Sequence, residues 1–275
     1  MDLKRYSKSF TNIRLPEIRK INLTTYKVLR DELKKHKDKC DIFDWVTLLD
    51  IISKGNFSET AIGCISEKCK YKFVLKLTQI TKDNKKVINN EIIALKALHN
   101  SPFFVNLYDS FECKTKKNTK LSVVIQELLG DSINKIIFKN KRLPKSFYFS
   151  VFKQTLRCIA ILESKRINHN DIHFENMLVT FDSNIKNLKI KLIDFGGATG
   201  ASRYKFKSGV DTVNSRKSKS GFTLGLDVDL FCNFILLYDD LTNSKYIPEE
   251  LYNLCSLIND YDYYISAKRL LRILK

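Results

Sequence analysis

The chain has 275 residues, of which 44% are hydrophobic and 28% are charged. This composition excludes a wholly disordered protein, and the length is sufficient for one large domain or two small ones. The net charge of +18 predicts attraction to an acidic protein, a nucleic acid or a membrane surface, although a generally basic surface without a dedicated site explains it equally well.

The N-terminus has no apolar signal region, and the longest apolar run, 231–238, is too short to span a bilayer. The seven cysteines form no C-x-x-C pair, which predicts reduced thiols rather than a disulfide framework or a zinc site. We therefore expect an intracellular, cytoplasmic protein without a membrane span.

Residues 1–44 are basic and polar, with apolar residues at helical spacing between 25 and 36 that predict an amphipathic helix. From Trp45 the pattern changes to strand-like runs. Two of these runs surround Gly55 and predict a hairpin, and a third run ends near Leu77. The change in pattern separates an N-terminal extension, 1–44, from the domain that follows.

The next segment, 89–99, carries Ile92, Leu95 and Leu98 at helical spacing, so we expect a helix with one apolar face. Glu91 lies near its start and is its only acidic residue. Two further strands are predicted in the runs FFVNLYDSF and LSVVIQELLG, and a long helix in the apolar stretch that ends at Ile167.

Three polar side chains cluster in the sequence directly after this long helix. Asp171 and Asn176 lie in the run I-N-H-N-D-I-H-F-E-N, and Asp194 follows the strand-like run L-K-I-K-L-I. Phosphoryl transfer needs a base to orient the attacking hydroxyl and oxygen ligands that hold Mg²⁺ against the phosphates. Asp171 can accept the hydroxyl proton, and Asn176 and Asp194 can hold the metal, because Mg²⁺ takes few protein oxygens.

The spacing H-x-D-x-x-x-x-N followed by D-F-G resembles the catalytic and metal-binding motifs of protein kinases. The resemblance covers roughly residues 47–240. It implies an α+β bilobal fold with an antiparallel β-rich N-lobe, 45–130, and a helical C-lobe, 131–275. Because few residues follow the last motif, we expect the C-terminal end of the C-lobe to be shortened.

The resemblance also assigns roles in the N-lobe. Lys76, in V-L-K, is similar to the lysine that holds the α- and β-phosphates of the nucleotide, and Glu91 to its ionic partner. The hairpin corresponds to the glycine-rich loop that covers the phosphates, although only the middle glycine is present. The loop positions are Ser53, Gly55, Phe57 and Ser58.

The run E-L-L-G-D-S-I at 127–133 is similar to the hinge between lobes in the casein kinase 1 group. By that resemblance Gln126 is the gatekeeper residue, and the backbone of Glu127 and Leu129 binds the adenine edge. Gly130 then marks the boundary between the lobes.

The catalytic loop departs from the commonest kinase pattern in two places. Asn170 replaces the arginine that pairs with a phosphate on the activation segment of many kinases, so control by that route is not expected. His173 replaces a lysine that meets the γ-phosphate; haspin-like kinases and small-molecule phosphotransferases carry histidine there. No A-P-E tripeptide follows, and Asp229 in the next helix is expected to support the catalytic loop.

The expected activity is transfer of the γ-phosphate of ATP, with Mg²⁺ or Mn²⁺, to Ser or Thr hydroxyls of proteins. The basic segment after D-F-G would suit acidic protein substrates, and nucleic acid is not expected as the primary partner. Two alternatives are a small-molecule phosphotransferase of the choline or aminoglycoside type and a catalytically inactive pseudokinase that serves as a binding module. The lysine-, asparagine- and isoleucine-rich composition and the reduced motifs suggest a large DNA virus as the source.

Overall fold

The computed structural model describes most of the chain from Val46 onwards. The described ranges are 46–54, 58–65, 71–115, 118–140, 143–180, 188–200, 221–242, 245–260 and 265–274. The predicted helix at 25–36, the loop residues Gly55 and Phe57, and residues 201–220 lie outside them.

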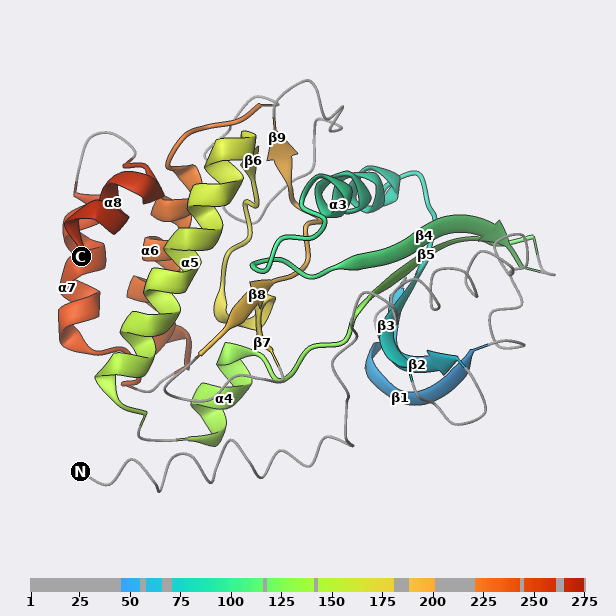
Figure 1. The fold of residues 1–275 in the computed structure, drawn as a ribbon, viewed down its shortest axis with the longest axis horizontal. Helices are drawn as coiled ribbons and strands as arrows, with labels where there is room; N and C mark the ends of the chain where they lie inside the picture. Colours follow the sequence, from blue (N-terminus) through green and yellow to red (C-terminus); the bar gives the residue numbers. More distant parts are fainter. Residues whose placement is uncertain are drawn as a thin grey trace.

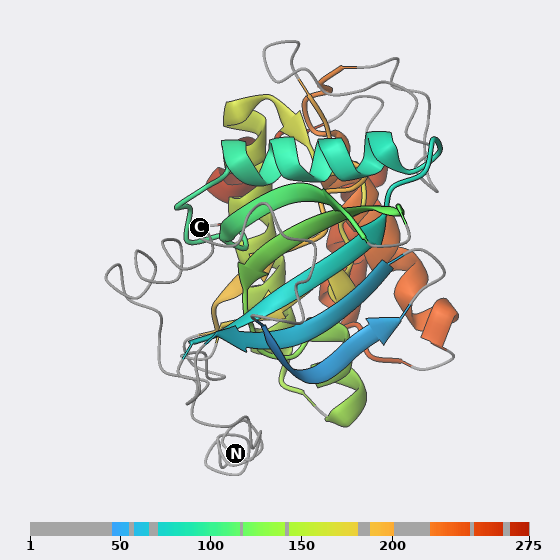
Figure 2. The ribbon, with the colours of Figure 1, turned by 90° about the vertical axis from the view of Figure 1, so that its right-hand side faces the viewer.

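The N-terminal part of the described chain is a five-stranded antiparallel sheet with the strand order β1-β2-β3-β5-β4 (Figures 1 and 2). On the third strand, Phe73 and Leu75 are fully buried in a small apolar cluster. Because side chains alternate along a strand, Lys76 lies on the opposite face of the sheet. The strands are β1 (Thr47–Lys54), β2 (Ser58–Ile65), β3 (Tyr71–Gln79), β4 (Leu107–Lys114) and β5 (Lys120–Glu127).

Helix α3 (Lys85–Ala97) lies along the β4 side of this sheet (Figure 2). Its buried face includes Ala94 and Leu95, as the apolar spacing predicts. The helix begins at Lys85, earlier than the apolar pattern alone indicates. Glu91 therefore lies in the middle of the helix and is buried, rather than near its exposed start.

The C-terminal part is mostly helical and contains two short strand pairs, β6 with β9 and β7 with β8 (Figure 1). Together with the sheet, it confirms the predicted α+β kinase-like fold. The helices are α4 (Ile133–Lys139), α5 (Lys145–Lys165), the short 3-10 helix η2 (Phe174–Asn176), α6 (Leu226–Thr242), α7 (Glu249–Asn259) and α8 (Ala267–Ile273). The strands are β6 (Ile167–Asn168), β7 (Met177–Val179), β8 (Ile190–Leu192) and β9 (Thr199–Gly200).

Helix α5 determines where the predicted catalytic loop begins. Its apolar face packs in the main core, where the ring of Phe152 stacks on Phe231 of α6 with centroids 5.7 Å apart. The helix ends at Lys165, and the next residue, Arg166, has a left-handed backbone (φ 57°) that turns the chain into β6. The loop that follows β6 is therefore held against the core at its entry.

The cysteines differ in part from the prediction of reduced thiols. Cys158, Cys232 and Cys255 are free and buried. The prediction is wrong for Cys64 and Cys113, which are disulfide-bonded, because sequence spacing does not report which thiols meet in space. In the described part of the chain, no helix has the length and apolarity needed to cross a membrane.

Candidate active site

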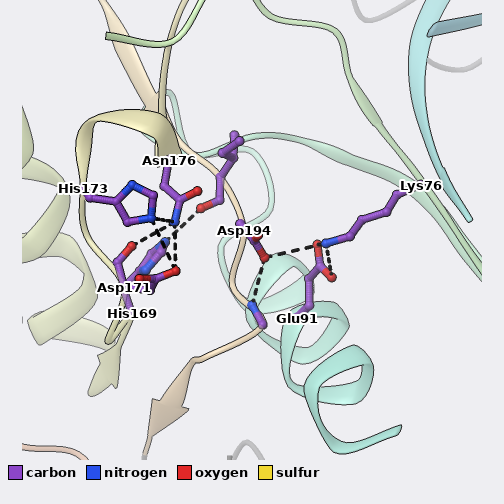
Figure 3. Close-up of polar contacts among 9 residues, drawn as sticks. Lys76, Glu91, His169, Asp171, His173, Asn176 and Asp194 are labelled. Atoms are coloured by element: carbon purple, nitrogen blue, oxygen red, sulfur yellow. Dashed lines mark hydrogen bonds and ion pairs between the residues drawn. The ribbon is translucent and has the colours of Figure 1, made fainter. Parts of the chain in front are cut away.

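Lys76 of β3 reaches across to Glu91 of α3 and forms an ion pair (Figure 3). Its Nζ donates to both carboxylate oxygens at 2.9 Å and lies 3.6 Å from Asp194 Oδ1. Burial lowers the pKa of Lys76, but the two carboxylates outweigh burial and raise it, so the ammonium stays charged. The lysine is thereby held as a fixed positive charge.

Glu91 is the buried partner in this pair, with only 4% of its surface exposed. Burial raises the pKa of its carboxyl group, and the ammonium of Lys76 opposes that shift. Gln126 of β5 lies close enough to Glu91 to lower its pKa as well. Gln126 is itself buried, and its Nε2 approaches the Glu91 carboxylate without reaching full hydrogen-bond geometry with any group in the described ranges.

A buried carboxylate of α6 binds the backbone of the predicted catalytic loop. Asp227 accepts the backbone N–H of His169 at 2.8 Å and that of Asn170 at 2.9 Å. The prediction that Asp229 has this role is wrong. Asp227 is 1% exposed, whereas the Asp229 carboxylate accepts from the exposed side chain of Asn233 one turn further along the helix.

Asp171, His173 and Asn176 lie together on this loop (Figure 3). Asn176 Nδ2 donates to the carbonyl and to Oδ2 of Asp171, at 3.0 and 3.1 Å. His173 Nδ1 accepts the N–H of Glu175 at 3.3 Å, and its Nε2 lies 2.9 Å from Asn176 Nδ2 and 3.5 Å from Asp171 Oδ2. The His173 hydrogen bond lowers the pKa of Asp171, so this carboxylate is ionised and able to accept a proton.

Asp194 lies between these two groups of side chains (Figure 3). Its left-handed backbone (φ 59°) follows β8, and Oδ1 accepts the N–H of Gly196 at 3.4 Å. The next side chain, Phe195, is fully buried against His169 and Phe104. This packing directs the Asp194 carboxylate towards Lys76 and leaves its side chain 48% exposed.

The predicted hinge begins at the end of β5. The Glu127 N–H donates to the Asn106 carbonyl at 2.9 Å, so of the main chain of this residue only the carbonyl is left for the predicted contact with adenine. The Glu127 side chain is engaged within the protein: its Oε2 accepts from Lys191 Nζ of β8 at 2.6 Å and from Asn106. A Cβ added at Gly130 would lie 2.9 Å from the Val179 Cγ2 atom of β7. A larger residue at this position would therefore displace the chain from β7.

The donor set fits a magnesium ion that keeps most of its ligands from nucleotide and water. Among the described residues there is no group of three or more His, Cys, Asp or Glu side chains that could hold a metal. Asn176 and Asp194 lie close together because the Ile193 N–H donates to the Asn176 carbonyl at 3.0 Å. The Asn176 amide directs Nδ2 at Asp171, which leaves Oδ1 for a cation.

The predicted loop over the phosphates is described only at its ends. Ser53 lies on β1 opposite Thr60, and Ser58 begins β2. Gly55 and Phe57, between them, lie outside the described residues. Leu129, the other predicted hinge contact, is 6% exposed. Its side chain is therefore buried, and the predicted hydrogen bond to adenine concerns its backbone alone.

Two functional contacts were missed from the sequence. The support of the loop backbone was assigned to Asp229 instead of Asp227. The sequence signal for this contact is the D-V-D pattern, which offers two carboxylates two residues apart and does not say which one faces the loop. The partly buried Glu127–Lys191 pair had no local signal, because the partners are 64 residues apart in the chain.

Comparisons with known proteins agree with this geometry. A family model described as the protein kinase domain matches residues 46–216. Probable serine/threonine-protein kinase fhkA of Dictyostelium discoideum is 33% identical over 60% of this chain and 28% of its own length. Serine/threonine-protein kinase PAK mbt of Drosophila melanogaster is 26% identical over 53% of this chain and 21% of its own length. The matches thus span less than a third of either relative, and neither of these relatives supports a viral source.

Proposed function

Because the chain belongs to the protein kinase family, we propose that it transfers the γ-phosphate of ATP to Ser or Thr hydroxyls of protein substrates. The observation that carries the proposal is the position of Asp194 between two groups of side chains, with Lys76 Nζ 3.6 Å from its carboxylate (Figure 3). Lys76 and Glu91 approach from the N-lobe, and Asp171 and Asn176 from the C-lobe. The names of the two relatives, together with the casein-kinase-1-like hinge, favour Ser and Thr as acceptors.

In the proposed reaction the acceptor hydroxyl oxygen attacks the γ-phosphorus, and the bond from that phosphorus to the β–γ bridging oxygen breaks. Asp171 takes the hydroxyl proton, which its lowered pKa permits at neutral pH. Lys76, held by Glu91, binds the α- and β-phosphates, and His173 lies beside Asp171 where a γ-phosphate would approach.

Asn176 and Asp194 would hold Mg²⁺, or Mn²⁺, which when bound supplies positive charge against the phosphate oxygens. The residues of the chain then act mainly by position, because phosphoryl transfer requires little covalent chemistry from the protein. The basic segment after D-F-G, including Arg203 and Lys205, supports acidic proteins as the preferred substrates.

The test is incubation of the purified chain with labelled ATP and Mg²⁺, in parallel with casein, a basic protein, choline, an aminoglycoside and no added acceptor. Asp194→Asn and Asp171→Asn are the matched controls. We expect label on Ser and Thr of casein with the wild type alone. Label on choline or an aminoglycoside instead would establish a small-molecule phosphotransferase. Nucleotide binding without transfer to any acceptor would establish a pseudokinase.

A further inference from the structure

The stretch that follows D-F-G is held by a carboxamide of the catalytic loop. Asn170 Nδ2 donates to the Gly197 carbonyl and to Thr199 Oγ1, both at 2.9 Å. Asn170 is 8% exposed and has a left-handed backbone (φ 66°), which asparagine tolerates better than most residues. Both hydrogens of this amide are therefore used on the same stretch of chain.

A second carboxamide reaches this stretch from α3. Asn90 Nδ2 donates to the Ala198 carbonyl at 3.1 Å, and both residues are fully buried. Asn90 precedes Glu91, the residue that pairs with Lys76. The contact therefore connects the position of α3, and with it the ion pair, to the residues directly after D-F-G.

A third carboxamide holds the chain where it returns to the C-lobe. Asn168 Nδ2 donates to the Thr223 carbonyl at 2.9 Å, and Asn168 Oδ1 accepts the Thr223 N–H at 2.7 Å. Asn168 is 1% exposed and also pairs with Thr199 in the β6–β9 ladder. One short strand thus contacts both ends of the segment 197–223.

We propose that Asn90, Asn168 and Asn170 are positioning residues that hold both ends of segment 197–223 in the arrangement needed for catalysis, so that catalysis requires no phosphate on that segment. The inference rests on the proposed kinase activity and adds its mode of regulation.

The chemistry of the contacts supports this mode of regulation. Carboxamides are neutral and bind main-chain carbonyl and N–H groups, which are present whether or not the segment is modified. Asn170 also stands where an arginine would otherwise supply charge for a phosphate. Because these amides are buried, each hydrogen bond that breaks leaves a polar group without a partner. Moving the segment out of this arrangement therefore costs free energy.

The first experiment removes every phosphate-accepting hydroxyl between the two held ends. The chain is dephosphorylated, verified by mass spectrometry, and compared with a variant in which these hydroxyl residues become Ala, or Phe for the tyrosine: Ser202, Tyr204, Ser208, Thr212, Ser215, Ser218 and Ser220. We expect kcat/KM within about twofold of the untreated wild type, because the carboxamide contacts remain. A fall to the level of Asp171→Asn in either sample, with the wild type active, would overturn the proposal and leave the kinase assignment intact.

The second experiment tests the contacts themselves. Thr199→Val removes the hydroxyl that accepts from Asn170 and keeps a similar shape, whereas Thr199→Ser keeps the hydroxyl. We expect about a tenfold loss of kcat/KM in the valine variant and near-wild-type activity in the serine variant. Asn168→Ala should lose at least as much, and Asn233→Ala, a carboxamide exposed on α6, is the matched control. Equal activity of the valine and serine variants would contradict the inference.

A third measurement does not depend on activity. In the unphosphorylated wild type, the Thr223 amide should be protected from hydrogen exchange, since its N–H donates to Asn168 Oδ1. Asn168→Ala should lose that protection, and Asn233→Ala should retain it. Fast exchange at Thr223 in the unphosphorylated wild type would overturn the proposal even if no kinase activity is found, and protection with no activity would overturn only the proposed function.

Discussion

The N-lobe half of the candidate site is positioned by one ion pair, whereas the C-lobe half is positioned by several hydrogen bonds from side chains to the backbone. In the first half, Lys76 and Glu91 meet at 2.9 Å and Glu91 is buried. In the C-lobe half, the side chains of Asp227, Asn168 and Asn170 bind main-chain groups. Loss of one partner should therefore leave a buried charge in the N-lobe, but only a few unsatisfied polar groups in the C-lobe.

The largest effect is expected at the proposed base. Asp171→Asn should lower kcat by about 10²–10⁴-fold, because the amide cannot accept the hydroxyl proton. Its side chain is 53% exposed, so the melting temperature should change little. Steady-state kinetics and thermal unfolding of the same preparation would check both parts. Unchanged kcat would remove Asp171 from its proposed role.

Next in size is the loss of the lysine from the ion pair. Lys76→Met should lower the free energy of unfolding by about 3 kcal/mol, because Glu91 is left buried without its partner. The double variant Lys76→Met/Glu91→Leu should recover most of that loss and remain inactive. Urea unfolding of the wild type, both single variants and the double variant measures the coupling. A single variant as stable as the wild type would contradict the comparison between the lobes.

A smaller effect separates the two carboxylates of α6. Asp227→Ala should destabilise by about 2 kcal/mol, because the N–H groups of His169 and Asn170 lose their acceptor in a buried place. Asp229→Ala is the matched control, with an expected loss below about 1 kcal/mol from the first turn of the helix. Chemical denaturation of both variants tests the corrected assignment, which would fail if Asp229→Ala cost more than Asp227→Ala.

The smallest effect is expected at Asp131, before α4. Burial raises its pKa, but hydrogen bonds from Lys139 and Lys135 outweigh burial and lower it below the ordinary value of 3.8. A lowered carboxyl pKa stabilises the fold above the unfolded-state pKa, and the contribution is lost as pH falls through the folded-state pKa. Asp131→Asn should therefore cost about 0.5 kcal/mol at pH 7, since both lysines are exposed.

The measurement for Asp131 is the unfolding free energy of wild type and variant between pH 7 and pH 2. The difference between them should persist down to about pH 5 and disappear as the wild-type carboxylate becomes protonated. A difference that grows as the pH falls would contradict the assigned direction of the pKa shift.

Motif spacing was enough to predict the fold and to select the candidate residues that lie on either side of Asp194 (Figure 3). Asp171, Asn176 and Asp194 lie on one short loop and strand pair, so local chain geometry brings them together. Lys76 and Glu91 were found because the order of strand and helix is typical of the family. These contacts follow from order along the chain.

Contacts that depend on helix register or on distant partners could not be predicted. Whether Asp227 or Asp229 faces the catalytic loop depends on how α6 is rotated in the core, which is set by packing of residues such as Phe231. The pairing of Asn168 with Thr223 joins residues 55 positions apart. The missing A-P-E motif indicated that the usual anchor of this segment is absent or replaced, without indicating what replaces it.

The unpaired amide of Gln126 has a consequence for inhibitor selectivity. Its buried Nε2, at the predicted gatekeeper position, makes no hydrogen bond of full geometry among the described residues beyond its effect on the Glu91 carboxylate, and a buried donor left unsatisfied costs about 1–3 kcal/mol. A purine-like compound that places a carbonyl or ring nitrogen there recovers part of that free energy in addition to its contacts with the hinge. The same compound would gain nothing against a kinase with an apolar residue at this position, so Gln126, as the predicted gatekeeper, offers a chemical basis for discriminating between this chain and its relatives.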